Sequence, residues 1–158
     1  MANAVGSHAV MGAIHRPATS GDAVRLFEIR RQSIRELARA AMTVEQVDAW
    51  AARLSPAGME LKLRELEIWV AEFDGTVVGW GAIRGDCLEG LYISPEFAGR
   101  GVGAALLAML EGLMQARGFR AACAEASSNA REFYLRRGYR AAGPQTPEGA
   151  WPIAKPLP

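Results

Sequence analysis

Three glycines at alternate positions, Gly99, Gly101 and Gly103, lie between a strand-like segment and a strongly apolar, helix-like segment. Glycine lets the backbone come close to a ligand, and the free amides at the start of a helix carry partial positive charge. These features favour a cradle for phosphate, although a plain turn without a ligand is the simpler alternative. The predicted cradle consists of Gly99, Arg100, Gly101, Val102, Gly103 and Ala104.

The same glycines also fit part of the dinucleotide-binding pattern. Ala104 follows Gly101 at a suitable spacing, and Glu125 stands at the end of the next predicted strand, where an acid would bind a ribose. The architecture excludes this interpretation. That pattern opens a series of strand–helix–strand units, yet the chain of 158 residues ends 33 residues after Glu125. The strands before the loop are joined by tight turns and are therefore antiparallel.

Hydrophobic periodicity and turn residues predict the elements that position the loop. Asp74-Gly75 is a strong hairpin signal, Thr43-Val-Glu-Gln46 is a capping box, and Gly118 is typical of a helix C-terminus. The expected strands are 10–16, 68–73, 76–83, 87–94, 119–126, one beginning at 139, and an edge strand at 151–155. The expected helices are 22–40, 43–54, helical turns at 59–66, then 101–117 and 128–137. The buried face of the first helix is expected to contain Val24, Phe27, Ile34, Leu37 and Ala41.

This order of elements predicts a single α/β domain. Its sheet should be mixed and mostly antiparallel, with six to seven strands and about four helices. One parallel crossover should run from strand 87–94 through helix 101–117 to strand 119–126. We expect residues 10–158 to form the domain and residues 1–9 to be a disordered start or a cloning remnant.

Two segments resemble the signature blocks of the GNAT superfamily of acyl-CoA-dependent N-acyltransferases: Pro95-Glu-Phe-Ala-Gly-Arg-Gly-Val-Gly103 and Ala130-Arg-Glu-Phe-Tyr-Leu-Arg-Arg-Gly-Tyr139. The element order matches over about residues 12–156, and the segments 31–38 and 43–50 are similar to a bacterial branch of acetyltransferases. The sequence departs from the pattern at Ala98, where the family carries a long polar side chain, and at Ser127, where it usually carries asparagine. The resemblance implies acetyl-CoA as the acyl donor and an amine as the acceptor.

The resemblance also implies catalytic residues. Tyr134 matches the tyrosine that faces the departing thiolate, and a phenol that is neutral at pH 7 can donate a proton to sulfur. Glu89 is the carboxylate on strand 87–94 and is the candidate base, directly or through water, with Glu125 as an alternative. A core aromatic and a solvated strand glutamate are the plain structural readings of Tyr134 and Glu89.

Further residues are implied as contacts of the cofactor. Gly90 interrupts an apolar strand and predicts a bulge, which in the family leaves backbone amides free for pantetheine and for the thioester oxygen. The backbone of Leu91, Tyr92 and Ile93 would supply these amides, with Ser127, Asn129 and Phe133 as neighbouring contacts. The two-helix segment and the hairpin should select the acceptor. A non-catalytic acyl-CoA sensor on the same fold is the alternative function.

Composition limits the remaining partners. A formal net charge of +1 gives no long-range attraction to nucleic acid or to an anionic membrane. No signal peptide is evident, nor an apolar run of the ~18 residues that a membrane span needs. The two cysteines, Cys87 and Cys123, lack metal-ligand spacing, so we expect reduced thiols in a cytoplasmic protein and no metal site. The expected partner is a small-molecule or peptide amine; the sequence also allows a homodimer.

Overall fold

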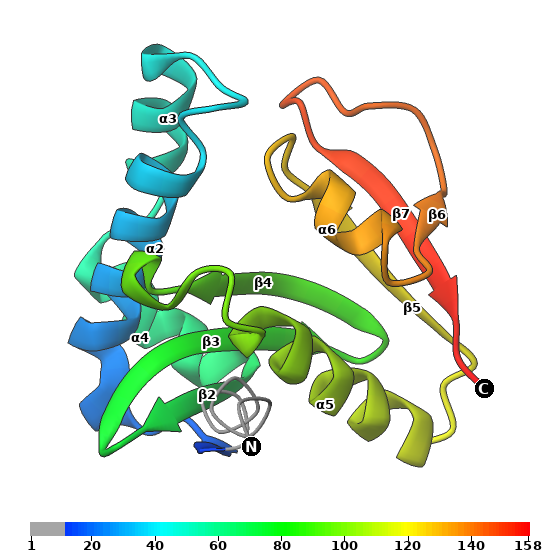
Figure 1. Cartoon of the computed structure of the whole chain (residues 1–158), viewed down its shortest axis with the longest axis horizontal. Helices are drawn as coiled ribbons and strands as arrows, with labels where there is room; N and C mark the ends of the chain where they lie inside the picture. The colour runs from blue at the N-terminus through cyan, green and yellow to red at the C-terminus, as the bar shows by residue number, and fades with distance from the viewer. Residues whose placement is uncertain (1–11) are drawn as a thin grey trace, which may run out of the picture.

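A computed structural model describes residues 12–158 and contains a mixed sheet of seven strands in the order β1-β2-β3-β4-β5-β7-β6 (Figure 1). The predicted segment 1–9 and the predicted strand start at Val10 lie outside the described residues. The strands are β1 Ala13–Pro17, β2 Glu67–Phe73, β3 Thr76–Arg84, β4 Cys87–Ile93, β5 Ala121–Ala126, β6 Arg140–Ala141 and β7 Trp151–Pro156. The α-helices are α2 Ala23–Leu37, α3 Val44–Ala51, α4 Pro56–Glu65, α5 Val102–Ala116 and α6 Arg131–Leu135; short 3₁₀ turns are η1 Ser20–Asp22 and η2 Pro95–Phe97. The predicted α/β class and the parallel β4–β5 crossover are confirmed.

Local signals determine where several elements begin and end. The Thr43 hydroxyl accepts a hydrogen bond from the Gln46 amide, and the Gln46 side chain accepts one from the Thr43 amide, which confirms the capping box. Asp74 and Gly75 both have positive φ, 52° and 77°, which matches the twist of a tight hairpin between β2 and β3. Gly118, with φ of 89°, follows the end of α5 as expected.

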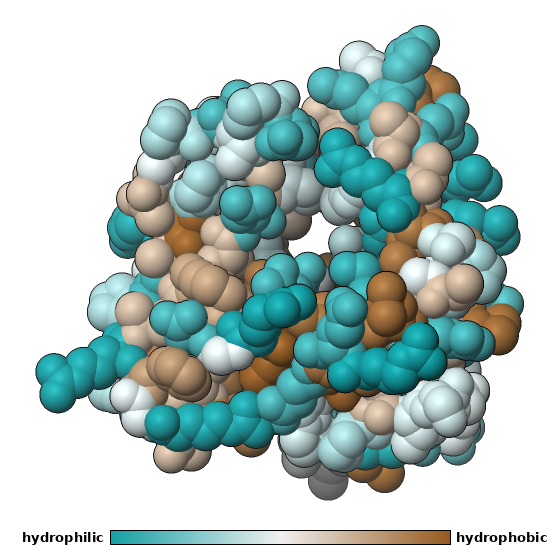
Figure 2. All heavy atoms as spheres, turned by 180° about the vertical axis from the view of Figure 1, so that it is seen from behind, coloured by the Kyte–Doolittle hydropathy of each residue, from teal (hydrophilic) through white to brown (hydrophobic). Residues whose placement is uncertain are grey.

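The sheet forks between β4 and β5. These two parallel strands pair only at Cys87 with Cys123 and at Leu88 with Ala124, and no pairing is present beyond these positions. One arm of the fork carries β1 to β4 with α2, α3 and α4, whereas the other carries β5, β6, β7 and α6 (Figure 1). Seen from behind, an opening separates the two arms (Figure 2). The fork therefore creates space at the carboxyl end of β4.

Apolar clusters hold the two faces of the sheet in place. On one face, α5 buries Leu107, Leu110 and Met114 against β3, β4, β5 and β7. On the other face, Leu26 and Ile29 of α2 pack with β2 and β3. Full burial of one such side chain contributes about 1.5–3 kcal/mol, so α5 is firmly fixed to the sheet and its N-terminus is rigidly placed.

The buried face of α2 differs from the prediction. Its buried residues are Ala23, Leu26, Ile29, Arg30 and Ile34, whereas Val24 and Leu37 are exposed. Arg30 is a charged residue within the apolar pattern of the helix, yet its side chain is buried together with the apolar ones. Its guanidinium donates hydrogen bonds to the carbonyls of Trp50 and Ala51 at the C-terminus of α3, where a cation is favourable.

The prediction that the last strand lies at the edge of the sheet is wrong. β7 is not an edge strand, because it pairs with β5 on one side and with β6 on the other. The Pro152 carbonyl accepts a hydrogen bond from the Ala142 amide, so the carbonyl and the nitrogen of Pro152 both face the β6 side. The β6–β7 ladder ends at Ala141, so β7 tolerates a proline, which has no N–H to donate, at this position.

The cysteines also differ from the prediction, because Cys87 and Cys123 form a disulfide across the only paired segment of β4 and β5. Their Cα atoms are 4.5 Å apart, which is within the range of such bonds. The reduced-thiol argument for a cytoplasmic location therefore does not hold. Among residues 12–158, no helix is both long enough and apolar enough to cross a bilayer.

Candidate active site

The glycine loop forms an open turn at the N-terminus of α5. Gly99 and Gly101 have φ of 75° and 84°, a conformation that strongly favours glycine, and Gly101 is the N-cap of the helix. A Cβ atom built on Gly99 would have no neighbour within 4 Å, so the space beside the loop is open. Open backbone amides at a helix N-terminus suit a diphosphate, and the residues present therefore fit the cofactor that the sequence implies.

Three elements meet at Gly103. A Cβ built there would lie 3.4 Å from Cγ1 of Ile93 in β4 and 3.5 Å from Cζ of Phe133 in α6. The first turn of α5, the end of β4 and the ring of Phe133 are therefore in direct contact. This places the predicted cradle beside the predicted pantetheine strand, at the fork of the sheet.

The predicted bulge in β4 is present. Ala82 of β3 pairs with Gly90 and Ile83 pairs with Leu88, so Glu89 is an extra residue in β4. Beyond the bulge the pairing is regular, and the Ser94 amide donates to the Val78 carbonyl. Because amides of successive strand residues point to opposite sides, those of Ile93 and Leu91 point away from β3 and into the fork. Both lack a partner strand there, as β5 has diverged.

The Tyr92 side chain has a role that the sequence did not predict. Its ring packs on Trp80, with centroids 5.0 Å apart, and near Trp50 of α3, at 6.4 Å, while the guanidinium of Arg30 lies 5.7 Å from its centre. A Cβ on Gly90 would lie only 3.1 Å from Cε2 of Tyr92, so glycine is needed there to leave room for this ring. The Tyr92 backbone is therefore paired with Trp80 of β3, whereas its side chain belongs to the wall formed with α2 and α3.

Tyr134 is buried, with 6% of its surface exposed, and its ring meets Phe133 edge-on with centroids 5.1 Å apart. Burial raises the pKa of its hydroxyl well above the usual range, and neighbouring Tyr92 adds to the effect. Within residues 12–158 the Tyr134 hydroxyl makes no hydrogen bond. It is not a fully buried atom, however, because in this range Nε2 of His15 is the only fully buried side-chain polar atom without a partner. The raised pKa keeps the Tyr134 hydroxyl protonated at neutral pH, and no hydrogen bond within residues 12–158 uses its proton.

The two candidate bases are on separate strands. Glu89 is exposed at the bulge, and its Oε1 lies 3.5 Å from Nε of Arg84. As a base it would have to leave this ion pair, which at such exposure costs little. Glu125 is exposed on β5, opposite Pro152 of β7.

Ser127 and Asn129 follow β5 and interact with each other, since the Ser127 hydroxyl donates to Oδ1 of Asn129 at 2.7 Å. Arg100 is exposed in the loop, with its guanidinium 5.1 Å from the centre of the Phe97 ring. Val102 is buried under the helix start, and Ala104 lies in the first turn. Of the residues predicted outside the cradle, the structure places Phe133 next to it, at Gly103.

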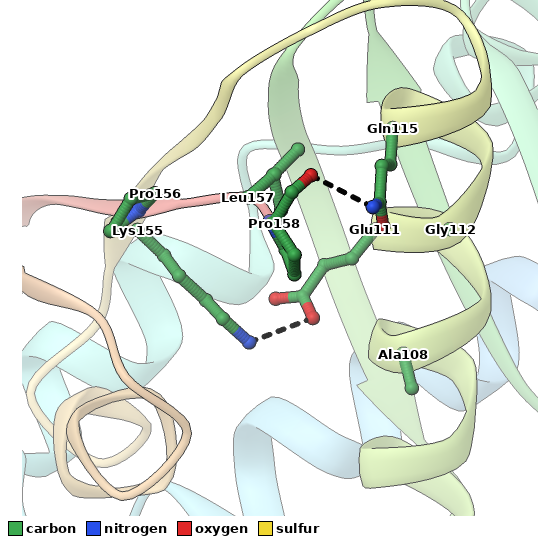
Figure 3. Close-up of a pocket in the computed structure, with 8 residues that line it drawn as sticks. All are labelled: Ala108, Glu111, Gly112, Gln115, Lys155, Pro156, Leu157 and Pro158. Carbon is green, nitrogen blue, oxygen red and sulfur yellow. Dashed lines mark hydrogen bonds and ion pairs between the residues drawn. The ribbon is translucent and has the colours of Figure 1, made fainter.

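A separate cavity of about 470 Å³ lies between α5 and the end of β7 (Figure 3). Two of its lining residues form an ion pair, with Nζ of Lys155 3.0 Å from Oε1 of Glu111. The Tyr139 hydroxyl, from outside the lining, donates to Oε2 of Glu111 at 2.7 Å. These contacts fasten β7 and the segment before β6 to α5. They position the α6 arm and include none of the predicted site residues.

Comparisons with known proteins agree with this geometry. The family model for acetyltransferase (GNAT) domains matches residues 38–151, and the chain therefore belongs to the GNAT superfamily. YafP, an uncharacterized N-acetyltransferase of Escherichia coli K12, is 28% identical over 133 residues, which cover 83% of this chain and 85% of that protein. These findings identify the chain as an acetyltransferase in general terms.

Solved structures of the same family are also similar. A GCN5-related N-acetyltransferase from Rhodopseudomonas palustris is 31% identical, with a TM-score of 0.84 over 92% of this chain and 96% of that chain. A phosphinothricin acetyltransferase from Sinorhizobium meliloti, solved with acetyl-CoA, is 25% identical, with a TM-score of 0.70 over 93% of this chain and 89% of that one. Acyl-CoA use is thus supported by relatives that share the fold.

Proposed function

We propose that this chain transfers the acetyl group of acetyl-CoA, or the acyl group of another acyl-CoA, to a primary amine by direct attack in a ternary complex. The observation that carries the proposal is the meeting of three elements at Gly103: the cradle of α5, the unpaired amides at the end of β4, and the α6 segment that bears Phe133 and Tyr134. The solved relative that holds acetyl-CoA supports the choice of donor.

The residues of the chain have distinct tasks in this reaction. The amides of Leu91 and Ile93 are available to hydrogen-bond the thioester side of the donor and hold its carbonyl carbon in place. As the amine nitrogen bonds to that carbon and the C–S bond breaks, the amine proton passes to Glu89, Glu125 or water. The Tyr134 hydroxyl protonates the departing sulfur and is later reprotonated from solvent.

Acyl-CoA binding without catalysis is the competing function, because the cradle alone would serve a sensor. A direct test measures the release of free CoA thiol from acetyl-CoA in the presence of a mixed panel of amines. An acetyltransferase releases CoA in an amine-dependent way; saturable binding of acetyl-CoA without release for any amine in the panel would support the sensor.

Binding itself is tested by thermal unfolding. Acetyl-CoA should raise the melting temperature in a saturable way, since it binds only the folded state, whereas NADH should leave it unchanged. A shift with NADH and none with acetyl-CoA would overturn the assignment. The cytoplasmic location, the homodimer option and the lack of nucleic-acid, membrane and metal partners stay predictions from the sequence.

A further inference from the structure

Arg137 is fixed on the face of Phe133. Its guanidinium carbon lies 3.9 Å from the centre of the Phe133 ring, and its Nη1 donates to the Phe133 carbonyl at 2.8 Å. The two residues are four positions apart, so they share one side of the α6 segment. A guanidinium stacked on a ring and hydrogen-bonded at one end has little freedom left to lose on binding a ligand.

Phe133 connects this cation to the cradle. The edge of its ring, at Cζ and Cε1, lies 3.5 Å and 3.6 Å from a Cβ built on Gly103, in the first turn of α5. The edge of the ring therefore touches the helix N-terminus, while its face carries the guanidinium. Arg137 consequently stands beside the open amides of the cradle.

Arg137 has no acidic partner in the described part of the chain. No carboxylate of residues 12–158 lies within 4.0 Å of its guanidinium, in contrast to the neighbouring Arg136, whose Nε lies 3.7 Å from Oε1 of Glu132. Within residues 12–158, one of the five N–H donors of Arg137 is used, on the Phe133 carbonyl. Arg137 therefore brings an uncompensated positive charge and several free donors to the side of the cradle.

We propose that Arg137 binds a phosphate group of CoA and is a specificity-determining residue for the cofactor. The inference rests on the proposed function and assigns a ligand contact to a side chain that the signature blocks did not single out. CoA offers this chemistry in two places, the diphosphate and the 3′-phosphate, and a planar guanidinium suits either. The competing role is purely structural, as a cap on the last carbonyls of α6.

The test is calorimetric titration of the folded protein with CoA, 3′-dephospho-CoA and pantetheine, the last measured by displacement. Arg137→Gln removes the charge but keeps an amide donor for the Phe133 carbonyl. We expect it to weaken CoA binding by about 10- to 100-fold, as for a charge-assisted hydrogen bond, and to leave pantetheine binding unchanged. Arg137→Lys should lie between this variant and wild type, because it keeps the charge and loses the planar fork. Arg136→Gln is the matched control and should bind CoA like wild type.

The ligands also separate the two phosphate sources. If the Arg137→Gln defect disappears with 3′-dephospho-CoA, the contact is to the 3′-phosphate; if it persists, the contact is to the diphosphate, and either result supports the proposal. Equal CoA affinity of Arg137→Gln and wild type, or an equal loss for pantetheine, would overturn it. If Arg137→Gln does not fold, Arg137→Lys with CoA affinity equal to wild type would overturn it. Failure of wild type to bind any of the three ligands would refute the proposed function itself.

Discussion

The rings of Tyr134 and Tyr139 meet edge to face, with centroids 5.4 Å apart and an interplanar angle of 76°. Both side chains are buried in the same apolar cluster. Their hydroxyls differ, because that of Tyr139 donates to Glu111 and that of Tyr134 has no hydrogen-bond partner within residues 12–158. The Tyr139 hydroxyl is thus held by Glu111, whereas the Tyr134 hydroxyl has no such partner in the part of the chain that the structure describes.

This contrast predicts unequal losses of stability for the same Tyr→Phe substitution at the two positions. Tyr139→Phe loses a hydrogen bond to a largely buried carboxylate and should lower the free energy of unfolding by about 1–3 kcal/mol. Tyr134→Phe keeps the ring packing, loses no intramolecular hydrogen bond and should change it by less than about 0.5 kcal/mol. Urea unfolding of both variants checks this; a loss for Tyr134→Phe as large as that for Tyr139→Phe would mean that its hydroxyl is structural.

Substitutions in the glycine loop should separate folding from cofactor binding. Gly103→Ala would meet only ordinary contacts from Ile93 and Phe133, so we expect a stable protein that still binds CoA, whereas Gly103→Asp should abolish binding by placing a carboxylate beside the diphosphate. Gly101→Ala should instead lower the free energy of unfolding by about 1–2 kcal/mol, because φ there is 84°. CoA titration and urea unfolding measure the two effects. Undiminished affinity in Gly103→Asp would refute the cradle.

Gly90→Ala should affect the acceptor more than the donor. The added methyl group would lie 3.1 Å from Cε2 of Tyr92, so the ring that packs on Trp80 must shift by a few tenths of an ångström. Because the Tyr92 ring belongs to the wall formed with α2 and α3, the Michaelis constant for the amine should rise more than that for acetyl-CoA. Gly112→Ala is a suitable control, since a Cβ there has no neighbour within 4 Å. A rise confined to acetyl-CoA would contradict the assignment of this wall.

The pH dependence of stability should reflect Asp22, which ties η1 to β1. The Arg16 guanidinium, at 2.9 Å, holds the pKa of the Asp22 carboxyl below its usual range, helped by the Thr19 amide. Because the pKa is lower in the folded state, the interaction stabilises the protein above about pH 4 and is lost as the pH falls through the folded-state value. Asp22→Asn should lower stability at neutral pH by about 1–3 kcal/mol and weaken the further loss in acid.

Urea unfolding at about pH 7 and about pH 3 measures this difference. Glu28→Gln is the control, since its pair with Arg25 is exposed and 3.6 Å long, and it should be nearly neutral. Identical acid sensitivity of Asp22→Asn and wild type would show that another group governs the transition.

Features encoded by short segments could be predicted from the sequence. The hairpin at Asp74-Gly75, the capping box at Thr43 and the glycine at the end of α5 depend on backbone chemistry within a few residues, and all three are confirmed. The position of β7 between β5 and β6 depends on pairing with distant strands, which no local pattern reveals. The disulfide depends on the register of β4 and β5 in the same way.

For the site, backbone features were more predictable than side-chain directions. The bulge beside Gly90 was expected, but the close approach of the Tyr92 ring to Gly90, and its packing near Trp50 of α3, depend on tertiary contacts. The spacing of four residues between Phe133 and Arg137 could have indicated that their side chains are neighbours. An arginine near a helix end, however, is ordinarily solvated or caps the last carbonyls. Its place beside the cradle follows from the contact between Phe133 and Gly103.

The turnover of Tyr134→Phe tests the central claim most directly. Burial keeps the hydroxyl protonated, and it makes no hydrogen bond within residues 12–158, so its removal should deprive the sulfur of its proton donor while binding and fold stay intact. Measured on a good amine acceptor under saturating acetyl-CoA, kcat should fall by about 10²–10⁴, with little change in the Michaelis constant for acetyl-CoA. A kcat within about tenfold of wild type would contradict the account and remove Tyr134 from the catalytic residues.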